Sequence, residues 1–264
     1  MRNLILPSKP HIAIHKFASC DGCQLAFLNL GPALLTLTER VEIVHFAEAG
    51  PVEPEARVDI AFVEGSISTA HDIARIKHIR AGCTLLVSIG ACATSGGIQA
   101  LKNGQDVAAW TRAIYAQANL IETLTSSDSV DSHVKVDFEL WGCPIGSDQI
   151  VGLITALLLG VAPEASNDSV CMACKQRGLV CVLVSGQQPC MGPVTRTGCG
   201  ALCPAVGRAC YGCFGPANQV NHRSLALCFG RFGMTPTQVA ERFNFINGQA
   251  EPFADAVSEL QELS

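Results

Sequence analysis

The stretch Thr84-Leu-Leu-Val-Ser-Ile-Gly-Ala-Cys-Ala-Thr-Ser-Gly-Gly97 joins an apolar, β-rich run to a glycine-rich loop that holds Cys92. The run Thr84–Ile89 is typical of a buried strand. The same order, a short strand pattern followed by a helical pattern, recurs from Pro10 to Gly160. Such alternation predicts βαβ units and an α/β fold with a parallel sheet.

The remaining elements of this first part follow from apolar spacing. Strands or extended runs are expected at His11–Lys16, Val41–His45, Asp59–Val63 and Val134–Leu140. Helices are expected at Gln24–Leu37, Ala70–Ile79, Asp106–Thr123 and Ser147–Leu159.

The amino-acid composition of the chain changes near residue 160. From Ser166 to Leu227, cysteine, glycine and proline interrupt the chain every few residues, which leaves little room for an ordinary core. Such a segment is expected to fold around a bound group. Surface helices are expected at Thr235–Phe243 and Asp255–Leu263. We therefore predict a domain over 1–162 and a cysteine-rich domain over 163–264.

Composition restricts the function. The 264 residues are 48% hydrophobic and 16% charged, which excludes a disordered or fibrous chain, and the net charge of −5 gives no basis for nucleic-acid binding. Met1–Pro10 lacks the pattern of a signal peptide, and the longest apolar stretch, Ile150–Ala162, has 13 residues, too few to span a bilayer. In an unexported, cytoplasmic chain, 14 cysteines indicate metal binding rather than disulfides.

Four cysteines of the first part lie directly after predicted strands. Cys20 and Cys23 stand in Ser19-Cys-Asp-Gly-Cys-Gln24, Cys92 in the quoted loop, and Cys143 in Trp141-Gly-Cys-Pro-Ile145. The carboxyl ends of parallel strands meet at one edge of the sheet, where ligand sites form. Four thiolates at that edge suit a [4Fe–4S] cluster.

Three other kinds of site are alternatives to an iron–sulfur cluster in these loops. A thioredoxin-like pair would explain Cys20 and Cys23 and leave Cys92 and Cys143 without a role. The loop Gly90–Gly97 lacks the Gly-Lys-Ser/Thr ending of a phosphate-binding loop. Zinc also accepts four thiolates, and Cys83, beside a strand, is expected to be a buried structural cysteine.

The second part holds eight further cysteines within 43 residues, enough for two Cys₄ sets. They are Cys171, Cys174, Cys181, Cys190, Cys199, Cys203, Cys210 and Cys213. The CxxC pairs, and the proline after Cys203, are typical of ferredoxin-style cluster binding. Spacing alone leaves two structural zinc sites open, and it does not settle which four cysteines share a cluster.

Taken together, the motifs resemble the small, electron-transferring subunit of [NiFe] hydrogenases, and most closely the delta subunit of the cytoplasmic NAD(P)-linked sulfhydrogenase group. The resemblance runs from about Ile12 to Phe229. It also includes Val63-Glu-Gly-Ser-Ile67. It implies a flavodoxin-like sheet domain followed by a cluster-organised C-terminal domain.

The resemblance assigns the cysteines to three [4Fe–4S] clusters. The proximal set, nearest the nickel–iron site of a partner large subunit, is Cys20, Cys23, Cys92 and Cys143. The distal set is Cys171, Cys174, Cys181 and Cys190, and the medial set is Cys199, Cys203, Cys210 and Cys213. Exported members have histidine where this chain has Cys171 and proline where it has Cys203, and Cys83 and Cys228 stay outside the clusters.

Two further residues have expected roles. His222, near the cysteine-rich segment, is expected to be a surface or packing residue because the thiolates suffice as ligands. Glu64 matches an acidic position near the proximal cluster. It is a candidate for proton handling, since burial tunes a carboxylate, and its alternative role is to cap the helix that follows it.

The resemblance implies that hydrogen is split in the large subunit and that this chain, itself without a catalytic residue, relays the electrons. Flavin-containing and ferredoxin-like partner subunits would exchange them with NAD(P). Two related functions compete: a small subunit of a hydrogenase linked to heterodisulfide reductase or deazaflavin reduction, and the cluster subunit of a respiratory NADH dehydrogenase. The latter usually has adjacent cysteines in its first motif, whereas Asp21 and Gly22 separate Cys20 from Cys23. A zinc-stabilised interaction module is the non-redox alternative.

Overall fold

The computed structural model describes residues 6–163 and 168–263. The start of Met1–Pro10 and the first two residues of the cysteine-rich segment expected from Ser166 lie outside the described residues. Within them, no helix is both long enough and apolar enough to cross a membrane.

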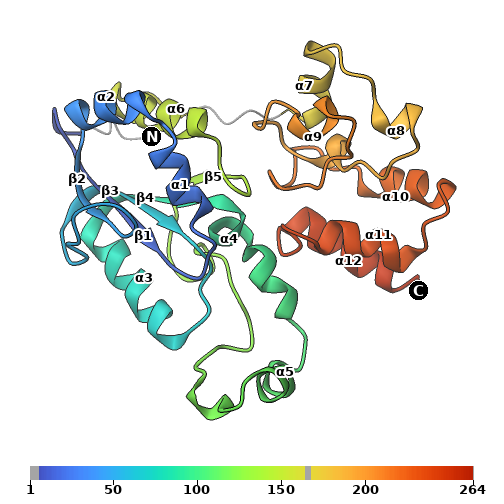
Figure 1. The fold of residues 1–264 in the computed structure, drawn as a ribbon, viewed down its shortest axis with the longest axis horizontal. Helices are drawn as coiled ribbons and strands as arrows, with labels where there is room; N and C mark the ends of the chain where they lie inside the picture. Colours follow the sequence, from blue (N-terminus) through green and yellow to red (C-terminus); the bar gives the residue numbers. More distant parts are fainter. Residues whose placement is uncertain (1–5, 164–167, 264) are drawn as a thin grey trace.

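A five-stranded parallel sheet forms the first part of the molecule (Figure 1). Its strands are β1 (His11–Lys16), β2 (Glu42–Phe46), β3 (Val58–Glu64), β4 (Cys83–Ile89) and β5 (Phe138–Leu140), in the order β2-β1-β3-β4-β5. This is the flavodoxin-like order, in which the chain reverses direction across the sheet between β1 and β3. The α/β prediction is confirmed, and the carboxyl ends of all strands meet at one edge.

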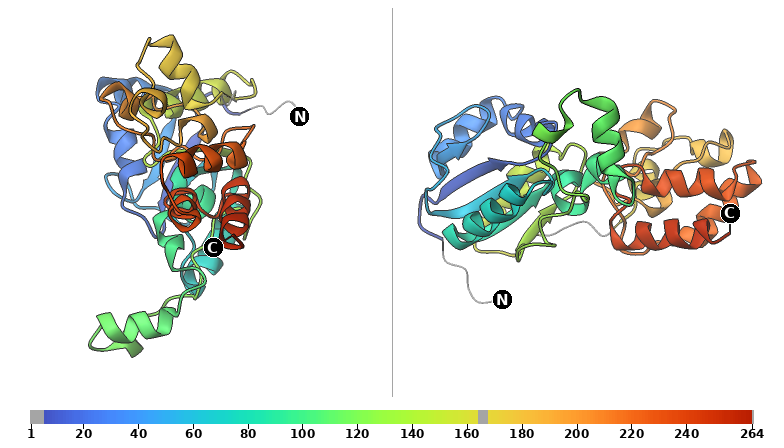
Figure 2. Two further views of the ribbon diagram at one scale, coloured as in Figure 1. Left: turned by 90° about the vertical axis from the view of Figure 1, so that its right-hand side faces the viewer. Right: turned by 90° about the horizontal axis from the view of Figure 1, so that it is seen from below.

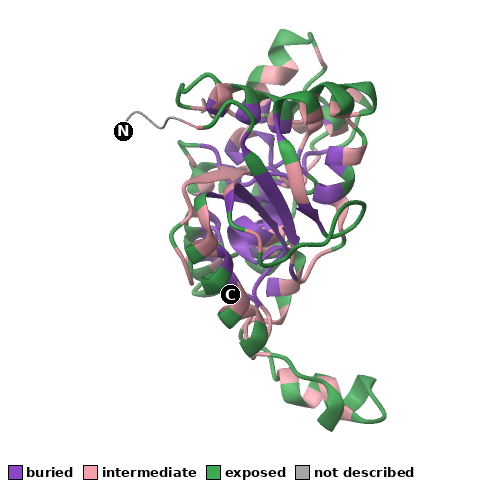
Figure 3. Ribbon diagram, turned by 90° about the vertical axis from the view of Figure 1, so that its left-hand side faces the viewer, coloured by how far each residue is buried: buried purple, intermediate pink, exposed green. Residues whose placement is uncertain are grey.

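Helices cover both faces of the sheet. On one face, α1 (Gly22–Leu28), α2 (Pro32–Arg40) and α6 (Ser147–Leu158) lie over the strands, and Phe27, Phe62 and Ile150 belong to a common buried cluster. On the other face, α3 (Ala70–Gly82) buries Ile76 and Ile79. Figure 3 shows the buried strands between these more exposed helices.

Some predicted boundaries were wrong. The helix expected over Gln24–Leu37 is two helices, because Gly31 adopts φ +56° and Pro32 starts α2. The helix expected over Asp106–Thr123 is only α5 (Val107–Ile114), and the run Val134–Leu140 supplies only three strand residues. A further helix, α4 (Gly90–Ser95), carries Cys92 and was not predicted.

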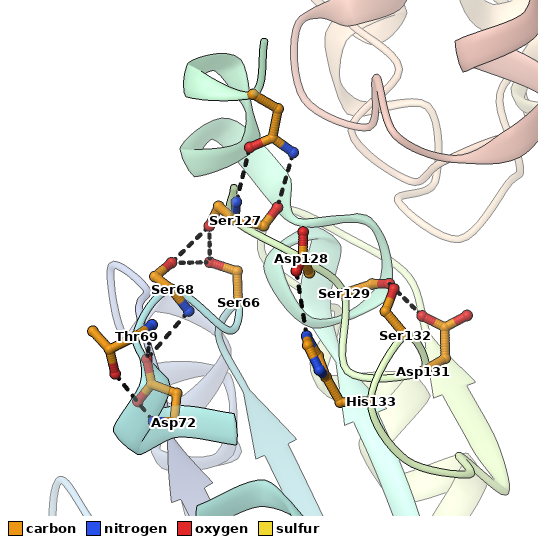
Figure 4. Close-up of polar contacts among 11 residues, drawn as sticks. Ser66, Ser68, Thr69, Asp72, Ser127, Asp128, Ser129, Asp131, Ser132 and His133 are labelled. Atoms are coloured by element: carbon orange, nitrogen blue, oxygen red, sulfur yellow. Dashed lines mark hydrogen bonds and ion pairs between the residues drawn. The ribbon is translucent and has the colours of Figure 1, made fainter. Parts of the chain in front are cut away.

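An arm extends from the first part. It comprises residues 103–127 with α5 and projects away from the rest of the molecule (Figures 1 and 2). Asn103 closes its base, since its side chain accepts a hydrogen bond from the Ser127 amide (2.8 Å) and donates one to the Ser127 carbonyl (3.2 Å). The Ser127 hydroxyl also contacts Ser66 and Ser68 in the loop after β3 (Figure 4).

The second part packs short helices around the cysteine-rich loops. The helices are α7 (Val170–Gln176), α8 (Val182–Ser185), α9 (Leu202–Ala205), α10 (His222–Arg231), α11 (Pro236–Asn244) and α12 (Glu251–Gln261). The cysteine-rich segment was not expected to contain a helix like α10. Phe229, Phe243 and Phe253 are buried together, and Cys190 and Cys210 belong to the same buried cluster.

Candidate functional site

The four cysteines of the first part meet at the carboxyl edge of the sheet. Glycines beside these cysteines show how closely the cysteine loops approach one another. A methyl group added to Gly22 would lie 3.4 Å from the Cys20 sulfur and 3.3 Å from Pro144 Cβ, and one added to Gly90 would collide with the Cys23 sulfur. The amide of Ala91 donates to the Gly142 carbonyl at 2.8 Å, which joins the Cys92 and Cys143 loops.

The mutual effects on their pKa values also indicate that these sulfurs lie close together. Burial, opposed by a hydrogen bond to Gln99 and reinforced by the charges of Cys143 and Cys20, raises the pKa of the Cys92 thiol to about 12. Burial raises the pKa of Cys23 as well, with Cys92 and Cys143 among the minor contributors. Crowded thiolates that repel one another bind well to a cationic metal core. The donor set therefore fits an iron–sulfur cluster.

Glu64 is placed against this set. It ends β3, is only 2% exposed, and its Oε1 accepts a 3.0 Å hydrogen bond from the Cys23 amide. Because Cys23 lies in the first turn of α1, the carboxylate caps α1. The expected capping of the following helix is wrong: α3 is capped by Thr69, which with Asp72 forms a capping box (Figure 4). Burial raises the pKa of Glu64, and its role in proton handling stays a prediction.

Cys171, Cys174, Cys181 and Cys190 line one cavity of about 130 Å³. Apolar side chains such as Leu179, Val182 and Leu183 complete its wall. A methyl group at Gly192 would lie 3.3 Å from the Cys190 sulfur and 3.7 Å from the Cys171 sulfur. Four sulfur donors around one apolar cavity fit a [4Fe–4S] cluster by the chemistry of the donor set.

The last four cysteines lie between the other two sets. Burial raises the pKa of Cys213 to about 12, with Cys199, Cys143 and Cys203 adding to the effect. The backbone of Cys143, close to the Cys213 sulfur, partly offsets this rise in the pKa of Cys213. On the other side, the Cys210 amide donates to the Cys190 sulfur at 3.2 Å. Contacts thus run from Cys143 through Cys213 and Cys210 to Cys190.

Two residues that the sequence analysis did not single out hold these loops together. Trp141, two residues before Cys143, packs so closely on Gly215 that a side chain there would collide with the indole ring. Asn247, in the turn between α11 and α12, bonds to both Ser95 and Gly212. The only sequence signal for the Asn247 contacts is an asparagine in a loop near the end of the chain. No spacing pattern identifies Asn247 as a contact residue.

The remaining predicted residues lie apart. Cys83, at the start of β4, is only partly buried and not buried as expected, and its sulfur is 3.7 Å from the Arg80 carbonyl. Cys228 lies within α10. His222 pairs with Glu259 at 3.0 Å, consistent with a packing residue. In the described part of the chain, no three His, Cys, Asp or Glu residues are arranged to hold a single metal ion.

Comparison with known proteins adds a family. Residues 20–157 match the family model of the NADH ubiquinone oxidoreductase 20 kDa subunit. Sulfhydrogenase 2 subunit delta of Pyrococcus furiosus is 33% identical, over 80% of this chain and 88% of its own length. A subunit of the F420-non-reducing hydrogenase (vhu) of Methanococcus voltae is 28% identical, over 97% of this chain and 100% of its own length.

Among solved structures, a chain of an NAD⁺-reducing [NiFe]-hydrogenase in the H₂-reduced state is 26% identical. The TM-score is 0.55, and the match covers 60% of this chain and 96% of that one.

Proposed function

This chain belongs to the NADH ubiquinone oxidoreductase 20 kDa subunit family and is a hydrogenase small subunit, and on that premise we propose that it relays electrons through three [4Fe–4S] clusters. The relay runs between the nickel–iron site of a large subunit and a module that exchanges electrons with NAD(P) through flavin. The observation that carries the proposal is the line of contacts from Cys143 through Cys213 and Cys210 to Cys190.

The proposal assigns one set of ligands to each cluster. The proximal cluster is held by Cys20, Cys23, Cys92 and Cys143, the medial one by Cys199, Cys203, Cys210 and Cys213, and the distal one by Cys171, Cys174, Cys181 and Cys190. Once bound, each cluster stores and releases single electrons. The protein excludes water from Cys23, Cys190 and Cys210, which are buried. Amide donors to sulfur, such as that of Cys210, favour the more negative, reduced form.

We assign these sites to two domains, 1–162 and 163–264. Two features support this division. The sheet has its own buried clusters on either face, and a further buried cluster extends from Val170 to Leu260. The family model ends at residue 157, ahead of the eight cysteines assigned to the medial and distal clusters. The medial and distal sites are therefore an addition to the sheet domain.

The large subunit is expected to cover the proximal edge. Cys20 and Cys143 are exposed there, and Leu25 and Ile98, each about half exposed, lie close to Cys23 and Cys92 in the chain. The arm adds a second apolar surface, since Trp110, Ile114 and Leu120 are exposed. Side chains of this kind become stable when a partner buries them.

The terminal acceptor belongs to another subunit. One observation favours a second candidate for the complex: a relative that matches 97% of the chain belongs to an F420-non-reducing hydrogenase. In that case the electrons would leave to a heterodisulfide-linked partner rather than to NAD(P). The relay within this chain is the same in both cases. We place the complex in the cytoplasm, where thiols stay reduced for cluster binding.

Metal analysis and EPR of the anaerobically purified complex test the proposal. We expect about twelve irons per chain and reduced-state signals of interacting [4Fe–4S] centres. Cys143→Ala, Cys203→Ala and Cys181→Ala should each remove about one third of the iron, whereas Cys228→Ser should remove none. About four irons would limit the proposal to the proximal site, and zinc without iron would refute it.

A further inference from the structure

Two consecutive glycines turn the chain back over the proximal site. Gly96 and Gly97 have φ +78° and +62°, in the left-handed region that favours glycine. A methyl group on Gly97 would lie 2.8 Å from the Cys92 sulfur and 3.0 Å from Gln99 Oε1, so the turn leaves no room for a side chain there. The short helix that follows, η1 (Gly97–Lys102), therefore holds Gln99 against the Cys92 sulfur.

The Gln99 side chain makes one contact at each end of its amide. The Cys92 thiol donates to Gln99 Oε1 at 3.3 Å, and Gln99 Nε2 donates to the Ala18 carbonyl at 3.1 Å. Ala18 lies two residues before Cys20, so one side chain connects the loops that carry two proximal ligands. Gln99 is partly buried and uncharged, so its electrostatic effect on the site comes from the amide dipole.

Binding to iron changes the hydrogen-bonding role of Cys92. When Cys92 binds a cluster, the thiol proton leaves to solvent, and a sulfur–iron bond takes the place of the sulfur–hydrogen bond. The sulfur is then only an acceptor, and the carbonyl oxygen of an amide pointing at it is repelled. The hydrogen bond from the Cys92 thiol to Gln99 Oε1 and cluster binding at Cys92 are therefore mutually exclusive.

The two partners of Gln99 differ in what they lose or gain when the amide turns. The Ala18 carbonyl also accepts a hydrogen bond from the Ser66 amide at 2.9 Å, so it keeps a partner without Gln99. An iron-bound thiolate sulfur carries negative charge, and hydrogen bonds to charged acceptors are stronger than those between neutral groups. Turning the amide therefore exchanges a weaker hydrogen bond to Ala18 for a stronger one to the sulfur.

We propose that Gln99 is a further residue of the proximal site, whose amide turns on cluster binding and donates through Nε2 to the Cys92 sulfur. This inference rests on the proposed function, because it requires a cluster on Cys92. A donor to a ligand sulfur stabilises the more negative, reduced form, so Gln99 raises the reduction potential of the proximal cluster. The same turn releases the Ala18 carbonyl, so Gln99 holds the loop before Cys20 only until the cluster binds.

The experiment uses the full chain purified anaerobically with its large subunit. It compares wild type with Gln99→Met, which removes the amide and keeps an unbranched side chain. A redox titration followed by EPR measures the reduction potential of the proximal cluster. We expect Gln99→Met to lower the reduced fraction at a fixed potential about tenfold, a fall of about 59 mV for a one-electron couple. Gln117→Met, at an exposed site of the arm, is the control and should leave the potential unchanged.

The direction of the shift distinguishes the two orientations of the amide. If Oε1 faced the iron-bound sulfur, its removal would raise the potential, so a higher potential in Gln99→Met would overturn the proposal. Pulsed EPR gives an independent readout. The reduced proximal cluster of wild type should show modulation from a side-chain nitrogen that is absent from Gln99→Glu, which keeps the shape of the side chain but has no nitrogen. Identical nitrogen modulation in these two proteins would also contradict the proposal.

Iron content distinguishes failure of this inference from failure of the proposed function. With about twelve irons per chain in both proteins, equal proximal potentials in wild type and Gln99→Met would refute only the role of Gln99. If Gln99→Met lost iron, the nitrogen modulation of wild type and Gln99→Glu would decide alone. A wild-type protein without a reducible proximal cluster would refute the proposed function, and this inference with it.

Discussion

Ser95 donates a 2.8 Å hydrogen bond to the side chain of Asn247, 152 positions later in the chain. Asn247 is 1% exposed, and its amide nitrogen donates a second hydrogen bond, also 2.8 Å, to the Gly212 carbonyl. Ser95 follows Cys92 by three residues, and Gly212 directly precedes Cys213. One buried amide thus joins a loop of the proximal set to a loop of the medial set.

We predict that Asn247→Ala separates these loops. The substitution removes two buried hydrogen bonds, each worth about 0.5–1.5 kcal/mol, while the Ser95 hydroxyl keeps its bond to the Ala91 carbonyl and the Gly212 carbonyl keeps its bond from the Gly215 amide. Asn247→Asp retains the acceptor for Ser95 but loses the donor to Gly212, so it should lie between wild type and alanine. The readout is the magnetic interaction between the proximal and medial centres in EPR of the reduced complex, with thermal unfolding measured beside it.

Asn218→Ala, on an exposed residue of the same part, is the control and should match wild type. If Asn247→Ala lowered thermal stability and left the magnetic interaction unchanged, Asn247 would stabilise the fold without setting the spacing of the two sites.

Gly90 supplies the second prediction. It has φ +84°, and a Cβ there would overlap the Cys23 sulfur. Gly90→Ala is therefore expected to displace Cys23 and to lower the iron content by about four per chain. The comparison is Gly152→Ala in α6, where a Cβ meets no atom within 4 Å; it should retain full iron and gain slight stability. Full iron in Gly90→Ala would contradict the assignment of Cys23 to the proximal site.

The sheet and the placement of the first four cysteines could be predicted from sequence because both depend on local patterns. Apolar runs of strand length identify β1, β3 and β4, and a cysteine just after such a run must lie at the carboxyl edge. Boundaries were less predictable. The helical spacing of Gln24–Leu37 continues through Gly31, and only the backbone shows that Gly31 turns the chain.

The contacts between the two parts were not predictable for a different reason. Ser95–Asn247 and Trp141–Gly215 join segments far apart in the sequence, and neither pair has a spacing signature. The grouping of the later cysteines likewise depends on three-dimensional neighbours, such as Cys190 and Cys210.

A third prediction concerns the base of the arm. Asn103→Ala removes both side-chain hydrogen bonds to Ser127. Amide hydrogen exchange across residues 103–127 should therefore become roughly tenfold faster, which corresponds to a loss of about 1.4 kcal/mol of local stability. Exchange in β1, β3 and β4 should not change. Asn119→Ala, exposed within the arm itself, is the matched control. Faster exchange in the sheet as well would mean that Asn103 supports the whole domain.

The last prediction comes from a buried pair of histidines. The rings of His15 in β1 and His45 in β2 stack with their centroids 4.6 Å apart, and each residue is 3% exposed. Arg75 of α3 lies on the same side. Burial, followed by the charges of His45 and Arg75, lowers the pKa of His15 from 6.5 to about 3, and burial lowers the pKa of His45 too.

A histidine whose pKa is lower in the folded state stabilises the protein above its unfolded pKa, and this stability is lost as the pH falls. The unfolded chain takes up a proton near pH 6.5, whereas folded His15 does not until about pH 3. Between pH 6.5 and 5.0 the free energy of unfolding should therefore fall by about 1–2 kcal/mol through His15 alone. Anaerobic urea unfolding measures it. His15→Phe keeps an aromatic ring beside His45 and should flatten the pH dependence of the free energy of unfolding. His71→Gln, on an exposed site of α3, is the control and should leave the wild-type slope. Equal slopes in all three proteins would show that folded His15 takes up its proton as readily as the unfolded chain.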